Sequence, residues 1–247
     1  MSKKTIAWAV AVLVGGLLAR PATAQTVDDV LSRYYEAMGG VAGWTGLQTM
    51  TASGTLSVAN GMMQGPFEII QKRPAMARME ITLQGMEIVS AYDGETAWQI
   101  FPITGSTEPQ VADPATARQL IEQADLDGPL IGWKEAGHRV ELAGRETVDG
   151  VEAIKLAVTL NTGEVSYYYL DAEDYVPIRI VAVREIQGAR TQLTTVLDEY
   201  REVGGLLFPF SIEVDSPVGI QALAFDRIEV NVPVDERVFS MPPGGAP

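Results

Sequence analysis

The sequence predicts a mainly β (α+β) protein: one large antiparallel sheet, strongly curved or nearly closed, with helices covering one opening. Two runs of short segments with alternating polarity predict the sheet, from about residue 49 to 101 and from about 140 to 230. Gly, Pro and Asn turns separate the segments. Strands this close in sequence pair as hairpins, because parallel strands need long crossover connections. Helical patterns precede the first run and separate the two.

The helices have recognisable start and stop signals. Thr26 and Asp29 form a capping-box pattern, apolar residues then recur at helical spacing, and Gly39-Gly40 ends the helix. A shorter helical piece is expected at 41–47. In the middle of the chain, Asp113 is a good N-cap and Pro114 suits the first helical position. That helix is expected to reach residue 124, followed by a short helical turn at 127–133 and one more near the end of the chain.

The strands follow from the alternation of apolar and polar side chains. In one example, Ala77, Met79, Ile81 and Leu83 point one way and the intervening polar residues point the other. Large curved sheets of this size enclose a cavity more readily than a filled core. The expected strands are Thr51–Val58, Gly65–Arg73, Ala77–Gln84, Met86–Tyr92, Thr96–Phe101, Val140–Thr147, Val151–Thr159, Glu164–Asp171, Pro177–Ile186, Gln192–Glu202, Leu206–Val214 and Ile220–Val230.

The first 24 residues resemble a cleaved secretory signal peptide rather than an anchor. Lys3 and Lys4 precede a short apolar run, and Ala22-Thr23-Ala24 supplies a small-x-small cleavage pattern. We expect residues 25–247 to form a single domain. That part has 15 basic and 32 acidic side chains, a formal charge near −17, which makes nucleic acid and anionic membrane surfaces poor partners.

Little in the sequence indicates catalysis. Cysteine is absent, His138 is the only histidine, and no nucleophile-elbow, P-loop or dinucleotide-binding motif occurs. The fragment DLDG (125–128) lacks the later ligands of a calcium loop and is typical of a connecting turn. An acid-dependent hydrolase would depend on Asp93 and Glu95, but Asp93-Gly94 is a strong hairpin-turn signal. We therefore expect no enzyme, no metal and no cofactor.

The apolar residues are more informative. Several methionines cluster in the early strands, and such flexible side chains suit a variable apolar ligand, although they also fill ordinary cores. Phe67, Ile69, Gln71 and Arg73 share one strand face. Arg73 stands at the strand end before Pro74, where its guanidinium can either bond carbonyls of a lid or remain in solvent.

These residues resemble the periplasmic LolA-type lipoprotein carriers. The stretch QKRPAMARMEI…EIVSAYDGETAWQIFP shares Lys72-Arg73-Pro74, Asp93-Gly94, Trp98 and Phe101-Pro102 with the pattern of that family. GPLIGW falls where such carriers have lid helices. The tail is similar to an F-x-P-P-x-G ending through Phe239, Pro242, Pro243 and Gly244.

The resemblance implies an open, incomplete β-barrel whose hydrophobic cavity lies under a helical lid, with Arg73 as the lid latch. It implies a periplasmic monomer that takes a lipidated protein or other lipid from an inner-membrane ABC transporter to an outer-membrane acceptor. A lipoprotein-sensing regulator that binds a protein partner is the alternative, because the fold serves both. The expected cavity and lid residues are Phe67, Ile69, Met79, Ile81, Leu83, Trp98, Ile100, Leu120, Leu130, Ile131, Tyr167 and Tyr169.

Overall fold

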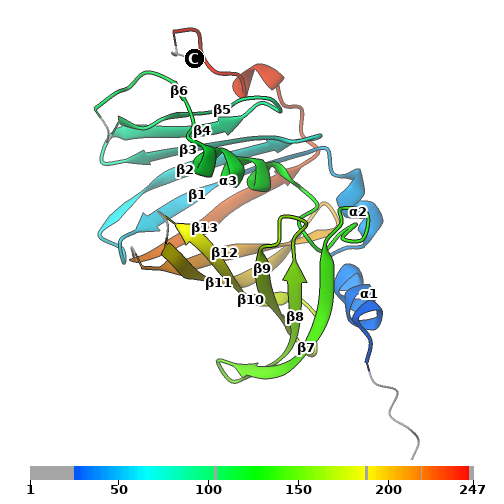
Figure 1. Ribbon diagram of the computed structural model, residues 1–247. Helices are drawn as coiled ribbons and strands as arrows, with labels where there is room; N and C mark the ends of the chain where they lie inside the picture. The colour runs from blue at the N-terminus through cyan, green and yellow to red at the C-terminus, as the bar shows by residue number, and fades with distance from the viewer. Residues whose placement is uncertain (1–24, 103–104, 187–188, 218, 245–247) are drawn as a thin grey trace, which may run out of the picture.

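One antiparallel sheet dominates the structure. The computed structural model describes residues 25–102, 105–186, 189–217 and 219–244, so the expected signal peptide lies outside the described residues. Within them, thirteen strands pair in the order β6-β5-β4-β3-β2-β1-β13-β12-β11-β10-β9-β8-β7 (Figure 1). The twelve expected strands are confirmed. The strands are β1 (Thr49–Val58), β2 (Met63–Lys72), β3 (Met76–Leu83), β4 (Met86–Tyr92), β5 (Ala97–Ile100), β6 (Gln110–Val111), β7 (Arg139–Val148), β8 (Val151–Thr159), β9 (Val165–Asp171), β10 (Pro177–Ile186), β11 (Ala189–Val203), β12 (Leu206–Ser216) and β13 (Gly219–Val230).

The sheet is strongly curved and does not close, since β6 and β7 are its two ends (Figure 1). Two glycines allow neighbouring strands to come close. A Cβ at Gly54, next to the register shift between β1 and β13, would lie 2.0 Å from the carbonyl oxygen of Ala224. A Cβ at Gly65 would lie 1.7 Å from the carbonyl oxygen of Thr82. Glycine inside a strand is typical of such close approaches and bends.

The helices begin where the sequence predicts. Helix α1 (Val27–Ala37) carries the complete capping box of Thr26 and Asp29, with the backbone N–H of Asp29 donating to Thr26 Oγ1 over 3.2 Å. Helix α2 (Val41–Gly46) follows at once. Helix α3 (Pro114–Ala124) has Asp113 as its N-cap and Pro114 in its first turn. A 3₁₀ turn, η2 (Glu236–Val238), confirms the expected turn near the end.

The expected helical turn at 127–133 is wrong. Residues 128–137 form consecutive turns instead. Gly128, Gly132 and Gly137 all have positive φ, between 62° and 73°. Left-handed residues at this spacing interrupt a right-handed helix, so the chain turns repeatedly on its way from α3 to β7. We refer to residues 125–137 as the crossing segment.

The concave face of the sheet holds the helices. Helix α3 packs on β3, β4 and β5, where its Leu120 meets Ala97 and Tyr92. Helix α1 places Val30 and Leu31 against Ile154, Leu156 and their neighbours in β8 and β9. Between these two contacts, a third cluster joins the α2 region to the central strands. This cluster comprises Leu47, Ala52, Leu126, Leu206, Phe208, Phe210 and Ile228.

The convex face is covered by the C-terminal segment. Trp98 is fully buried there, its Nε1 donates to the carbonyl oxygen of Phe239 over 2.7 Å, and the Arg78 guanidinium lies 5.7 Å from the centre of its ring system. Lys72 Nζ and Arg78 Nη1 donate to carbonyl oxygens of Val234 and Val238. The segment therefore crosses the outer side of β2 to β5 as a strap.

Among the described residues, no helix is both long and apolar enough to cross a membrane.

Trp98 should be a main contributor to stability. We expect Trp98→Ala to lower the free energy of unfolding by about 3–5 kcal/mol, because a large buried side chain leaves a cavity and the strap loses a hydrogen bond. Urea unfolding followed by circular dichroism measures this. Met62→Ala, at a side chain that is 80% exposed, is the control and should change stability by less than about 0.5 kcal/mol. Equal midpoints for the two variants would contradict the role of Trp98.

Candidate functional site

Arg73 joins three segments of the chain at the end of β2. Its Nε donates to the carbonyl oxygen of Leu47 over 2.6 Å, and Nη2 donates to that of Trp44 over 3.0 Å. Its Nη1 and Nη2 form a two-pronged ion pair with Asp127, at 2.7 and 2.6 Å. The hydrogen bond with Asp127 raises the pKa of Arg73 above its usual value. The guanidinium thus fastens the crossing segment to the α2–β1 connection and to the sheet.

The crossing segment packs into two apolar clusters as well. Leu126 is buried in the cluster of the central strands, and Leu130 is buried against α1 and β8. The hydroxyl of Tyr35 donates to the carbonyl oxygen of Leu130 over 2.7 Å. Gln71, on the same strand face as Arg73, donates to the carbonyl oxygen of Gln123 at the end of α3. The segment is therefore held at several points, and only the Arg73–Asp127 contact is an ion pair with both side chains mostly buried.

Much of the concave face remains only partly buried. The registers place residues from β3, β4 and β11–β13 on the side that α3 occupies. Their side chains are apolar and partly exposed rather than enclosed. We call this set the concave apolar patch: Met79, Ile81, Ile88, Leu197, Ile212 and Leu223. A surface of this kind, concave and sheltered but not filled, is suited to an apolar ligand.

Eight of the expected cavity and lid residues lie on the concave side or in its cover. Phe67, Ile69, Met79, Ile81 and Leu83 share the concave face through the pairing of β2 with β3. Leu120 lies on the side of α3 that faces the sheet, and the other two belong to the crossing segment. Those two are Leu130 and Ile131. Ile131 also lines a cleft of about 390 Å³ between α1, α2 and the crossing segment, together with Tyr35 and Trp133.

The other four expected residues lie on the convex face. Trp98 and Ile100 pack with Val89 and Ala91 beneath the C-terminal strap. Tyr167 and Tyr169 pack against Val148 and Ala153 on the outer side of β8 and β9. The structure does not bring these four together with the concave residues. Alternation shows which residues share a face, but these strands are apolar on both faces, so it could not identify the concave one.

Sequence reasoning missed several concave residues. Tyr168, between the two outward tyrosines, packs with the concave cluster at α1, and Phe208 and Phe210 do so near α2. Leu156 and Leu170 would have indicated which residues of β8 and β9 face the concave side, because they share the face of Tyr168. Asp127 was interpreted as part of a turn; nothing local to DLDG shows that its carboxylate meets an arginine 54 residues earlier.

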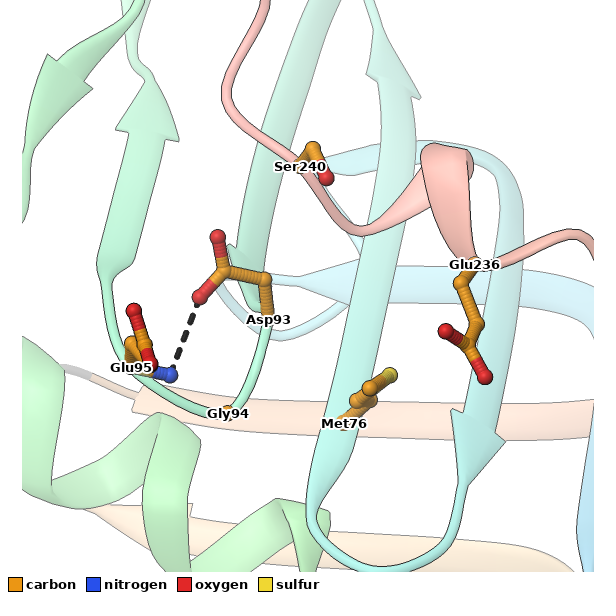
Figure 2. A pocket seen from close by; sticks show the side chains of 6 residues that line it. All are labelled: Met76, Asp93, Gly94, Glu95, Glu236 and Ser240. Atoms are coloured by element: carbon orange, nitrogen blue, oxygen red, sulfur yellow. Dashed lines mark hydrogen bonds between the residues drawn. The ribbon is translucent and has the colours of Figure 1, made fainter.

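The acidic pair Asp93 and Glu95 shapes a turn. Figure 2 shows these two side chains at the rim of a shallow pocket of about 300 Å³, near Met76, Glu236 and Ser240. Asp93 Oδ1 accepts hydrogen bonds from the backbone N–H groups of Glu95 (3.0 Å, dashed in Figure 2) and Thr96 (2.7 Å). Such a side chain stabilises the reversal of the chain between β4 and β5. Within the described residues, no group of three or more acidic, histidine or cysteine side chains is suited to hold a metal.

Comparison with solved structures identifies the fold. No family model matches the chain. No curated protein matches it either. Three crystal structures are similar. A DUF1329 family protein from Desulfovibrio piger is 11% identical with a TM-score of 0.57, and the match covers 85% of this chain and 97% of that one. A LolA superfamily protein from Nitrosomonas europaea is 13% identical with a TM-score of 0.55, covering 87% of this chain and 97% of that one, and an outer membrane lipoprotein-sorting protein domain from Vibrio parahaemolyticus, described as putative, is 12% identical with a TM-score of 0.54, covering 85% and 95%. The chain has a LolA-like fold.

The LolA-like fold confirms the resemblance that the sequence carries around Lys72-Arg73-Pro74. At 11–13% identity the likeness concerns the backbone architecture alone. The open, curved sheet, the helices on its concave face and their near-complete overlap with the solved chains agree with that architecture. The chemistry of the site therefore has to be argued from the residues of this chain.

The ion pair of Arg73 should hold the crossing segment in place. We expect Arg73→Leu to leave the sheet folded but to accelerate hydrogen exchange in residues 125–137, because Asp127 and two carbonyl oxygens lose a charged donor. Hydrogen bonds to charged groups contribute about 1.5–3 kcal/mol, which corresponds to roughly 10- to 150-fold faster local opening. Hydrogen exchange with mass spectrometry measures it. Arg227→Leu removes an exposed pair with Glu229 and is the control. Unchanged exchange in Arg73→Leu would contradict the latch.

Asp93 should matter as a hydrogen-bond acceptor and not as an acid. Asp93→Ala is expected to lower the free energy of unfolding by about 0.5–2 kcal/mol, since the N–H groups of Glu95 and Thr96 lose their acceptor. Asp93→Asn retains an acceptor oxygen and should stay within about 0.5 kcal/mol of the parent, as should Glu95→Gln. Thermal and urea unfolding decide this. Equal losses in the alanine and asparagine variants would show that the charge matters instead.

Proposed function

We propose that this chain is a periplasmic carrier that binds the acyl chains of lipoproteins, or of other lipids, and delivers them towards the outer membrane. The observation that carries the proposal is the concave apolar patch. Its side chains face the helices yet stay partly open, whereas the convex face at Trp98 is sealed by the strap. An apolar surface left in this state favours a ligand that removes it from water.

The energetic basis is burial of alkyl chains. Each buried methylene contributes about 0.8 kcal/mol, so a chain of twelve or more carbons can bind firmly without any polar contact. The residues of the patch come from strands on both halves of the sheet. Met79 and Met86 add flexible side chains, which adjust to ligands of different shape.

Helix α3 and the crossing segment form the proposed lid. Loading requires that they move from the concave face, and the Arg73–Asp127 ion pair opposes this movement in the empty protein. The lid also carries its own apolar residues, Leu126 and Leu130, which lose their packing when it opens. A bound alkyl chain replaces that lost contact. Loading and lid opening are then coupled through one apolar surface.

The fold comparison supports a role in lipoprotein handling, because one of the similar structures is an outer membrane lipoprotein-sorting protein domain. The full proposal includes a cleaved signal peptide, a donor such as an inner-membrane ABC transporter and an outer-membrane acceptor. It describes binding and transfer without catalysis. Native mass spectrometry of the protein purified from its periplasm tests it directly. A co-purifying acyl species is expected, and a protein that stays empty and ignores added lipid would contradict it.

A charged residue in the concave apolar patch should prevent binding. We expect Leu223→Glu to weaken the binding of a neutral fluorescent alkyl probe at least tenfold, because the carboxylate must be desolvated where the chain lies. The matched control is Ala224→Glu on the same strand, an exposed position on the convex face. Probe titration by fluorescence, with circular dichroism to confirm folding, gives the result. Equal weakening by both variants would show that the concave face is not the binding surface.

A further inference from the structure

An arginine lies on the concave face opposite α3. In β10, Ile180 pairs with Tyr168 and Ala182 with Ser166, both on the concave side. Arg184 follows two residues later on the same side, and 23% of its side chain is exposed. It thus emerges from the concave wall of the sheet, where it pairs with Thr191 and lies diagonal to Leu193 on β11. A charged side chain in this place requires an explanation.

The guanidinium of Arg184 is incompletely paired. Among the described side chains, its nearest carboxylate is that of Glu164, with 3.8 Å between Nε and Oε2, which is longer than a hydrogen bond. Its Nη1 is buried and has no hydrogen-bond partner. Arg73, by contrast, uses Nε, Nη1 and Nη2 in four bonds of 2.6 to 3.0 Å. Buried donors are nearly always paired, so an open Nη1 indicates a missing acceptor.

Groups from two neighbouring elements face this guanidinium. Glu164 and Tyr168 approach from the β9 side and Glu122 from α3, and Arg118 is the other cation near Glu122. Desolvation raises the pKa of Glu122 despite the opposing field of Arg184, and Glu164 raises it further. Desolvation likewise raises the pKa of Tyr168 to about 12. The surroundings therefore shield the arginine from water, and the lid helix forms one side of the enclosure.

We propose that Arg184 binds the anionic head group of a lipid whose alkyl chain lies against the concave apolar patch. This inference rests on the proposed carrier function and specifies its ligand. Carboxylate and phosphate share the required chemistry, because a guanidinium fork donates two parallel hydrogen bonds to either group. The head group would take Nη1 and Nη2, and the chain would extend along the patch past Leu193. Closing α3 over the ligand would complete the enclosure through Glu122 and Tyr168.

A matched pair of arginines allows a sharp test. Arg179, in the same strand, faces the convex side, where it pairs with Asp149 at 2.6 Å and also has one unpartnered nitrogen. Arg184→Gln and Arg179→Gln therefore remove the same charge from opposite faces. The probes are oleate, oleyl phosphate and oleyl alcohol, which share one alkyl chain. Their affinities are measured by displacement of a neutral fluorescent alkyl probe, with circular dichroism as the folding control.

We expect the parent protein to bind at least one of the two anions tenfold or more tightly than the alcohol, equivalent to about 1.4 kcal/mol. Arg184→Gln should lose this preference and keep its affinity for the alcohol, whereas Arg179→Gln should retain both. The preferred anion then identifies carboxylate or phosphate. If Arg184→Gln does not fold, Arg184→Lys keeps the charge and should retain part of the preference.

Three results would overturn the inference. Equal affinity of the parent for all three probes would leave the carrier function intact and remove the head-group site. An equal loss of alcohol and anion binding in Arg184→Gln would assign Arg184 a structural role between β10 and α3. Binding of none of the probes by the parent would remove the proposed carrier function and, with it, the head-group site.

Discussion

An open sheet has two faces, and the apolar part of each must be removed from water. A barrel that closes fully has only one outer surface, but here β6 and β7 remain apart, and strands such as β5, β8 and β9 carry apolar residues on both sides. On the convex side, the C-terminal strap covers Trp98. The concave side receives three helices and the crossing segment, which do not cover it completely. The way in which the helices and the strap are divided between the two faces therefore decides which apolar surface stays partly exposed.

The crossing segment, which helps to cover the concave face, is held by fewer contacts than the sheet. The strap adds its hydrogen bonds along strands that already pair with each other, so it strengthens an existing sheet. The crossing segment joins parts that no ladder connects, and its left-handed glycines prevent it from supporting itself as a helix. Its position therefore depends on the packing of Leu126 and Leu130, the hydrogen bond from Tyr35 and the ion pair of Asp127 with Arg73. An element with few contacts opens at lower free energy than the sheet beneath it.

Strand positions, helix caps and the curved antiparallel sheet were predictable from the sequence because each depends on local pattern. Thr26 and Asp113 cap their helices through bonds within three residues. The absolute facing of a strand is not local. Trp98 and Tyr169 belong to strands with apolar residues on both faces, and the choice between faces depends on a strap and helices far away in the sequence. Asp127 was likewise unpredictable, since its partner is set by the tertiary fold.

The two concave arginines illustrate how one residue type serves different ends. Arg73 stands at the edge of the patch and is satisfied entirely by groups of the protein, so it stabilises a closed arrangement. Arg184 stands across from α3 with an unpaired nitrogen, although Glu164 and the electrostatically coupled Glu122 belong to the same enclosure. The chain is strongly acidic and therefore contains many carboxylates that could pair with an arginine. An arginine left open in such a chain, beside an unfilled apolar surface, favours an acceptor that comes with the ligand.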